Sequence, residues 1–378
     1  MASQPASYFP SLYGDLVTRY PPGPNWEGVD LPALETAAKT LVPMGYIASS
    51  SAFVSNLSHV TTYLCDPRCV TNVVVTSPTY VPGTDRRTRY VTLMNAITTA
   101  PTRVLRQLLV QLSVRPADPA TSSRATSVIG AWAGRSLYTS PMGAALPSWG
   151  DDLEFFNCVA AVAVALISLA PRVAMARSGS VRAWVVNLLG ILESGRLPIR
   201  KNNIAVTAML ARTLCRIYLG RDTRPLDAVA AEVAAFAAQN VTPDGFITTE
   251  SRQSMTVEYQ YRCATMILLC QCVLRQAGGV ALTMSRVSQS ALGNVVANLD
   301  AVAARGTPTV SSPSFFHDKT GCTEAMSNVT ADQVTQLRQM MDFAFGSNDP
   351  AKLTKTSYLW ASFTFGDLQQ LIRAIAAS

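Results

Sequence analysis

The chain has 378 residues, which is long for one compact hydrophobic core and suits two lobes of ordinary domain size. Charged residues make up only 15% of it, against a usual share of about 25%, and apolar residues make up 48%. So small a charged fraction suggests that much of the surface is covered, for example by further copies of the chain. The eight cysteines lack the spacing of a disulfide framework, and the first residues lack the regions of a signal peptide, so we expect an intracellular, reduced protein.

The N-terminal 30 residues are rich in Pro, Gly, Ser and aromatic residues and have no helical period, which predicts an arm. Their apolar side chains would be buried either on a neighbouring subunit or on the chain's own domain; they are Tyr8, Phe9, Leu12 and Tyr13. Helical spacing begins at residues 31–41. Residues 70–81 alternate and are β-branched, so they are the best strand or hairpin candidate.

A turn with the sequence PGTDRRTRY follows this predicted hairpin and carries Arg86, Arg87 and Arg89 beside Tyr90. Guanidinium groups next to an aromatic ring suit contact with the phosphate backbone and stacking on bases. A helix is expected over residues 91–112. Residues 115–150 contain many helix-breaking residues and predict a loop or mobile flap.

The stretch from 151 to 224 organises the rest of the chain. It opens with Asp151, Asp152 and Glu154, which suit the N-terminus of a helix because the helix dipole favours negative charge there. An uncharged run follows over residues 155–170. This run is shorter than the roughly 20 residues needed to cross a bilayer. We therefore expect a buried core helix and no membrane insertion.

The positive charge of the chain is concentrated in its middle. From Arg86 to Arg224 there are 17 Arg and one Lys against six acidic residues, a net charge of +12, whereas the remaining residues together carry −5. A basic middle between mildly acidic flanks is typical of a site that binds a polyanion. Arginine outnumbers lysine 26 to 5, and its planar guanidinium binds phosphate oxygens in pairs. The alternative is that these arginines only decorate solvated helix faces.

The second half of the chain is predicted to be helical over 225–239, 255–276, 284–304 and 330–345. The helix at 255–276 is apolar enough to form the core of a second lobe, and Gly278 and Gly279 would end it. Residues 305–321 read as a loop. The chain closes with a short amphipathic helix, preceded by aromatic residues that are candidates for docking on a neighbour: Tyr358, Trp360, Phe363 and Phe365.

No set of residues in the sequence favours catalysis. The only histidines, His59 and His317, lie in unrelated contexts, and no glycine-rich phosphate loop occurs. Cys65 and Cys69 have metal-ligand spacing, but no second pair completes a tetrahedral site. We expect no enzyme activity, no cofactor and no metal. No motif for sequence-specific nucleic-acid recognition is present, which leaves sequence-independent contact with phosphates.

The layout resembles that of the nucleoproteins of non-segmented negative-strand RNA viruses, most nearly those of bornaviruses and the mymonaviruses of fungi. The shared features are the length, the two-lobed helical organisation, the basic middle and the arm-like ends. They also include an apolar helix followed by arginine-bearing helices, LEFFNCVAAVAVALISL and then RVAMARSGSVRAWVVNLLGIL. The resemblance implies RNA held in a groove between two lobes, and subunits joined by exchanged arms into a helical ribonucleoprotein. No functional residue is carried over by position.

We therefore predict a mainly α, two-lobed protein with terminal arms and at most a small β-hairpin. The predicted parts are an N-terminal arm (1–30), a basic N-terminal lobe (31–224), a C-terminal lobe (225–350) and a C-terminal arm (351–378). The residues predicted to contact RNA phosphates are Arg86, Arg87, Arg89, Arg172, Arg177, Arg182, Arg200, Lys201, Arg212 and Arg216.

The predicted function is to coat single-stranded RNA as a homo-oligomer in the virion and in the host-cell cytoplasm or nucleus. A viral polymerase or phosphoprotein is a further candidate partner. The first alternative is an icosahedral capsid protein of a small double-stranded RNA virus, whose basic face would line the shell and touch the genome loosely. A cellular helical scaffold without nucleic acid and an unrecognised hydrolase are the remaining alternatives.

Overall fold

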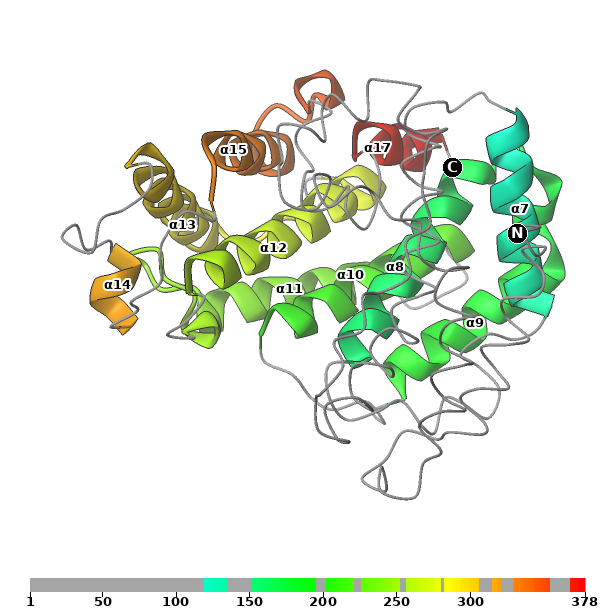
Figure 1. Cartoon of the computed structure of the whole chain (residues 1–378), viewed down its shortest axis with the longest axis horizontal. Coiled ribbons are helices and arrows are strands. Elements are labelled where there is room, and N and C mark those ends of the chain that lie inside the picture. Colours follow the sequence, from blue (N-terminus) through cyan, green and yellow to red (C-terminus); the bar gives the residue numbers. More distant parts are fainter. Residues whose placement is uncertain are drawn as a thin grey trace, which may run out of the picture. The chain divides into compact units, whose positions relative to one another are not determined.

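The computed structural model describes residues 119–134, 151–194, 202–220, 226–251, 256–279, 282–305, 315–320, 329–353 and 368–377 (Figure 1). This part of the chain is 85% helical with almost no strand, which confirms the prediction of a mainly α fold. Within it, the β-type pairing is a single antiparallel bridge between Val241 and Ile247. The predicted hairpin at 70–81 lies outside the described residues.

The chain divides into two compact units. The first comprises Met1–Pro198 and Thr364–Gly366, and the second comprises Ile199–Phe363 and Asp367–Ser378. The sequence predicts a division after residue 224, and the observed one falls earlier in the chain. The difference concerns helix α10 (Asn203–Leu219), which packs against helices of the second unit.

Helix α8 (Asp151–Leu169) is the buried element of the first unit. It begins at the first of the three acidic residues that the sequence analysis placed at a helix N-terminus. Every residue from Phe155 to Ile167 is buried, on all sides of the helix. This confirms the predicted core helix. No helix among the described residues combines the length and apolar character needed to cross a membrane.

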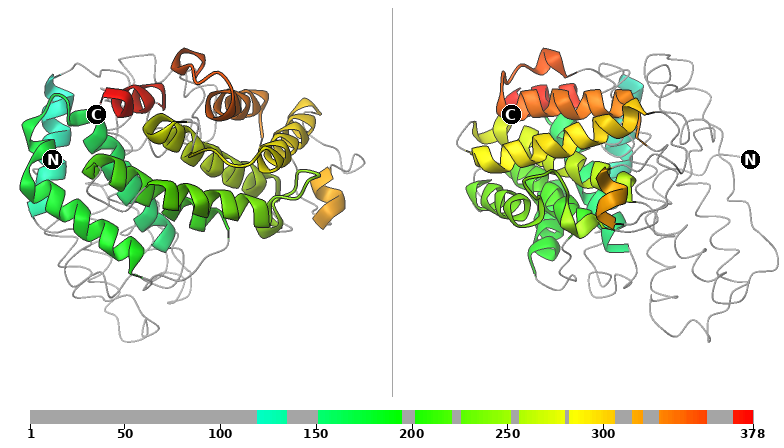
Figure 2. Two further views of the ribbon diagram at one scale, coloured as in Figure 1. Left: turned by 180° about the vertical axis from the view of Figure 1, so that it is seen from behind. Right: turned by 90° about the vertical axis from the view of Figure 1, so that its left-hand side faces the viewer.

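Helix α9 (Gly179–Glu193) follows α8 after a short 3₁₀ helix, η3 (Ala174–Arg177). Its buried residues recur at the spacing of one helix face, which explains why this segment is helical and which side packs inward. They are Val181, Trp184, Val185, Leu188 and Leu189. The helix packs against η3 and against α7 (Pro119–Gly134), as Figure 2 shows.

The helix α7 corrects the prediction of a loop over residues 115–150. Pro119 occupies the first position of this helix, where its missing N–H costs nothing. Ala125 and Ile129, four residues apart on one face, are completely buried. The prediction was wrong because it counted helix breakers without regard to their position, and because packing against α9 stabilises a segment of modest propensity. Residues 135–150 lie outside the described part.

Helix α12 (Thr256–Gly278) is the centre of the second unit, as the sequence analysis predicted. All 13 residues from Cys263 to Arg275 are buried. The helices that surround it are α10, α11 (Leu226–Asn240), α13 (Arg286–Ala304), α15 (Ala331–Phe345) and α17 (Leu368–Ala377). The helix ends at Gly278, and Gly279 takes a positive φ of 76°, which confirms the predicted glycine stop.

A tight turn after α11 is fixed on the side of α13. Gly245 in this turn has φ of 88°, and the Asn294 and Asn298 side chains of α13 donate hydrogen bonds to the carbonyl oxygens of Pro243 and Asp244, at 2.7 Å and 2.9 Å. The Lys319 ammonium lies 2.6 Å from the Asp244 carboxylate. Close packing, rather than flexibility, therefore defines this turn.

The short helix α14 (Phe315–Thr320) carries Lys319 and corrects the prediction of a continuous loop over 305–321. Phe316 of this helix is completely buried and lies against the ring of Phe246, with ring centroids 6.4 Å apart. The sequence alone does not show whether two adjacent aromatic residues belong to a short helix or to a loop packed on the core, because one or two helical turns are too short for a period to be measured.

The chain ends with helix α17, which confirms the predicted amphipathic helix. Its apolar face packs against α12 of the same chain through Leu368, Leu371, Ile372 and Ile375. The Gln369 side chain fixes its start by donating to two carbonyl oxygens, that of Pro350 in the 3₁₀ helix η6 (Pro350–Lys352) and that of Leu353 just after it.

Candidate nucleic-acid interface

The residues predicted to contact RNA fall into three groups. Five lie outside the described residues: Arg86, Arg87, Arg89, Arg200 and Lys201. Arg172, Arg177 and Arg182 belong to the first unit, and Arg212 and Arg216 belong to the second. The aromatic residues predicted for the two arms also lie outside the described part; they are Tyr8, Phe9, Leu12, Tyr13, Tyr358, Trp360, Phe363 and Phe365.

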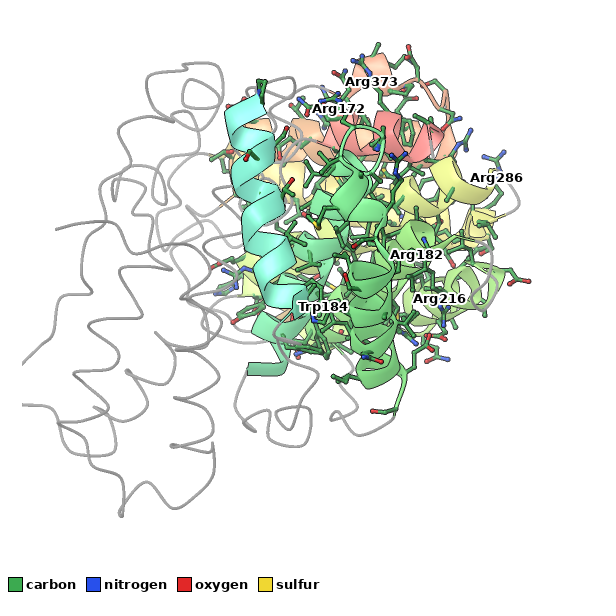
Figure 3. All side chains as sticks on the ribbon, turned by 90° about the vertical axis from the view of Figure 1, so that its right-hand side faces the viewer. Arg172, Arg182, Trp184, Arg216, Arg286 and Arg373 are labelled. Carbon is green, nitrogen blue, oxygen red and sulfur yellow. The ribbon has the colours of Figure 1, made fainter. Side chains whose placement is uncertain are left out.

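Three of the predicted arginines lie close together in sequence where the chain passes from α8 to α9. Arg172 follows the last turn of α8, and its N–H donates to the carbonyl of Leu169 at 2.9 Å. Arg177 is the last residue of η3, and Arg182 is in the first turns of α9. Arg172 and Arg177 are exposed and Arg182 is half-buried. Figure 3 labels the first and the last of them. We call residues 172–182 the basic junction.

The basic junction lies in a segment without acidic residues. From Phe155 to Leu192 the chain has three arginines and no Asp or Glu, and Glu193 follows at the far end of α9. Among the residues that the structure describes, Arg177 makes no ion pair. The segment from 155 to 192 therefore supplies no carboxylate of its own to the three arginines.

The first turn of α9 adds a contribution that the sequence analysis missed. Ser178 caps the helix, its hydroxyl accepting a hydrogen bond from the N–H of Val181 at 3.4 Å. Gly179 and Ser180 are exposed, and the first turn contains no acidic residue. The N–H groups of a first helical turn favour anions. The signal in the sequence was the Ser-Gly-Ser run between two arginines, which is a common helix start.

The two predicted residues on α10 are not available to a phosphate. Arg212 is 17% exposed and forms an ion pair with Glu232 of α11. Arg216 is 2% exposed and is among the largest fully buried side chains of the described residues. The structure therefore does not support these two predictions. The physical reason is that residues four apart share a helix face, and this face of α10 packs inside the unit.

The described residues as a whole are electrically balanced. They include 14 Arg and Lys and 14 Asp and Glu, so their formal net charge is zero. The chain's net charge of +7 consequently lies in the remaining segments, which hold 17 basic and 10 acidic residues. The basic junction is thus a local concentration of charge on a neutral set of helices.

The part of the chain that the structure describes contains no metal site, and three of its buried cysteines are held in the thiol form. No group of three or more His, Cys, Asp or Glu there could hold a metal ion. Burial, with a smaller contribution from the Glu250 carboxylate, raises the pKa of Cys263 well above its usual range. Burial likewise raises the pKa of Cys270 and Cys272. At neutral pH these thiols are protonated and unreactive.

Comparison of the sequence with protein-family models and with curated proteins gave no match to either. The assignment of function therefore depends on the fold, the distribution of charge and the geometry of the basic junction.

Proposed function

We propose that this protein is a viral nucleoprotein that coats single-stranded RNA through sequence-independent contacts with the phosphate backbone. The observation that carries the proposal is the basic junction, where Arg172, Arg177 and Arg182 follow one another between the end of α8 and the first turns of α9 with no acidic residue in their segment. Guanidinium groups on helical ends bind phosphate without reading bases. The absence of any sequence-reading motif fits the same mode of binding.

The energy of such binding comes from released counterions. Each phosphate contact to a single strand contributes about 0.7 to the slope of log affinity against log salt concentration. In about 0.1 M salt, one decade below the 1 M reference, each contact is therefore worth about a fivefold change in affinity. Three contacts at the junction would supply about a hundredfold, so tight binding requires further basic residues. The segments with Arg86, Arg87, Arg89, Arg200 and Lys201 are the candidates.

Self-assembly is the second part of the proposal. Only 15% of the residues are charged, which suits a chain whose surface is largely covered by its own copies. We propose that the terminal arms join neighbouring subunits into a helical ribonucleoprotein, and that a viral polymerase or phosphoprotein binds the assembly.

The experiment that tests this function is purification of the chain with and without nuclease treatment. We expect RNA to co-purify from the untreated sample, and the nuclease-treated protein to bind a short fluorescent RNA of any sequence with an affinity that falls steeply with salt. Protein that carries no RNA and binds none at low salt would refute the proposal.

An icosahedral capsid protein of a small double-stranded RNA virus is the second candidate. The balanced charge of the described helices favours it, because a shell protein touches its genome loosely and needs no strongly basic body. Negative-stain images of the assembled protein separate the two candidates, since a nucleoprotein forms filaments or rings and a capsid protein forms closed spheres.

A further inference from the structure

We propose that Ser180 is a phosphorylation site for an arginine-directed serine kinase, and that a phosphate there weakens polyanion binding by the basic junction. The consequence for binding rests on the proposed function, whereas the modification itself does not. The two parts are therefore tested by separate measurements below.

Ser180 has the sequence context and the exposure that such a kinase requires. Arginine-directed kinases bind a substrate arginine three residues before the target hydroxyl with acidic side chains, and Arg177 occupies that position. Both Ser180 and Arg177 are exposed. In the described helices, two other hydroxyl residues follow an arginine by three positions: Ser127 after Arg124, and Thr265 after Arg262. However, Thr265 is 3% exposed and bonds to the Tyr261 carbonyl inside α12.

The fold of the junction can accept a phosphate on Ser180. The cap of α9 is provided by Ser178, whose oxygen accepts from the Val181 N–H, so modification of Ser180 leaves the cap in place. Ser180 Oγ lies 3.3 Å from Ser178 Oγ, a weak contact on the surface. A phosphate in the first turn of a helix is favoured by the helix dipole. Ser178 already has an extended backbone, with φ of −65° and ψ of 149°, so fraying one turn of α9 would present the segment to a kinase.

The chemistry is ordinary phosphoryl transfer from ATP supplied by the host cell. Ser180 Oγ forms a bond to the γ-phosphorus, the bond to the β,γ-bridging oxygen breaks, ADP leaves, and the hydroxyl proton passes to a carboxylate of the kinase. The product carries a charge of about −1.5 to −2 at neutral pH. That charge offsets about two of the three positive charges of the junction, and so weakens its attraction for RNA phosphates.

Offsetting two positive charges, which is equivalent to losing two phosphate contacts, predicts the size of the effect. With about 0.7 in salt slope for each contact, RNA affinity in about 0.1 M salt should fall about 25-fold, and the slope should become shallower by about 1.4. A purely structural role for Ser180 would change neither quantity in this way.

The modification is tested on the full chain with the catalytic subunit of cyclic-AMP-dependent protein kinase and ATP. Peptide mapping by mass spectrometry should place a phosphate on Ser180 in the wild-type chain and in Ser178→Ala, and on no residue of the junction in Ser180→Ala. Arg177→Ala should slow the reaction at Ser180. A wild-type chain that is phosphorylated elsewhere but not at Ser180 overturns the proposed site.

The consequence is tested by RNA affinity before and after the kinase reaction, with kinase-treated Ser180→Ala as the matched control for phosphorylation at other positions. A drop of about 25-fold in the wild type and none in the control supports the switch. Unchanged affinity with Ser180 fully phosphorylated overturns it. If the unmodified protein binds no RNA at all, the proposed function fails, while the peptide map still decides whether Ser180 is modified.

Discussion

Substitution of Gly245 by alanine should destabilise the second unit strongly, because this glycine combines a left-handed backbone with close contact to a helix. Its φ is 88°, and a Cβ atom placed there would lie 2.4 Å from the backbone carbon of Asn294 and 2.6 Å from Nδ2 of Asn298. Real Cβ atoms do not approach other atoms so closely. The turn would have to move away from α13.

The magnitude follows from three contributions. The left-handed conformation costs alanine about 1–2 kcal/mol. Overpacking against α13 costs typically about 1–3 kcal/mol. Displacement of the turn also weakens the two asparagine hydrogen bonds to Pro243 and Asp244, each worth about 1 kcal/mol. Because these terms overlap, we expect a total loss of about 3–5 kcal/mol in the free energy of unfolding.

Gly279 provides the matched control. It also has a positive φ, 76°, but a Cβ atom there meets nothing within 4 Å. Gly279→Ala should therefore cost only the backbone term, about 1–2 kcal/mol. Urea unfolding of both variants, followed by far-ultraviolet circular dichroism, measures the difference. If Gly245→Ala is destabilised no more than Gly279→Ala, the packing of the turn on α13 is not as described.

Two further predictions concern polar groups of the second unit. Arg275 is buried and donates to the carbonyl oxygens of Ala344 and Gly346 at the end of α15, at 2.9 Å and 3.1 Å. Arg275→Met should therefore lower the free energy of unfolding by about 2–4 kcal/mol. A change under about 0.5 kcal/mol in urea unfolding would contradict this role. Hydrogen bonds from Lys319 and Thr242 lower the pKa of Asp244 below its ordinary value of 3.8. The stability that they contribute is therefore complete above that value and is lost as the pH falls through the lowered pKa. Thermal unfolding at neutral pH should show Asp244→Asn to be less stable than the wild type by under about 1 kcal/mol, because the Asp244–Lys319 pair is exposed. This difference in stability should disappear in acid. A difference that persists in acid would argue against an origin in the Asp244 carboxylate.

Helix existence could be predicted where the sequence has a strong, long pattern. The uncharged run at 155–170 could only be buried, and the apolar helix at 255–276 had too few polar residues to face solvent. The helix predicted over 330–345 is confirmed by α15, and the structure adds a capping box formed by Thr330 and Gln333 at its start. In each case the sequence pattern and the burial of the segment in the folded unit favour the same helix.

Helix α7 and the side chains of α10 could not be predicted in this way. α7 has a modest helical preference and depends on its neighbour α9 for burial. Arg212 and Arg216 add to the charge of the sequence, yet their positions on an inward face remove them from the surface. A count of charges gives no information about which face of a helix is exposed. Arg172 and Arg177, by contrast, lie between α8 and α9 and are exposed.

The most direct test of the central claim is RNA binding by Arg177→Glu/Arg182→Glu, compared with Arg286→Glu/Arg373→Glu. The control changes the net charge equally at two exposed arginines of the second unit, both labelled in Figure 3. In about 0.1 M salt the first variant should bind single-stranded RNA at least about 25-fold more weakly, with a shallower salt slope. The control should stay within about threefold of the wild type, because screening over about 10 Å limits long-range effects. Equal affinity in the two variants would contradict the claim that the basic junction holds the phosphate backbone.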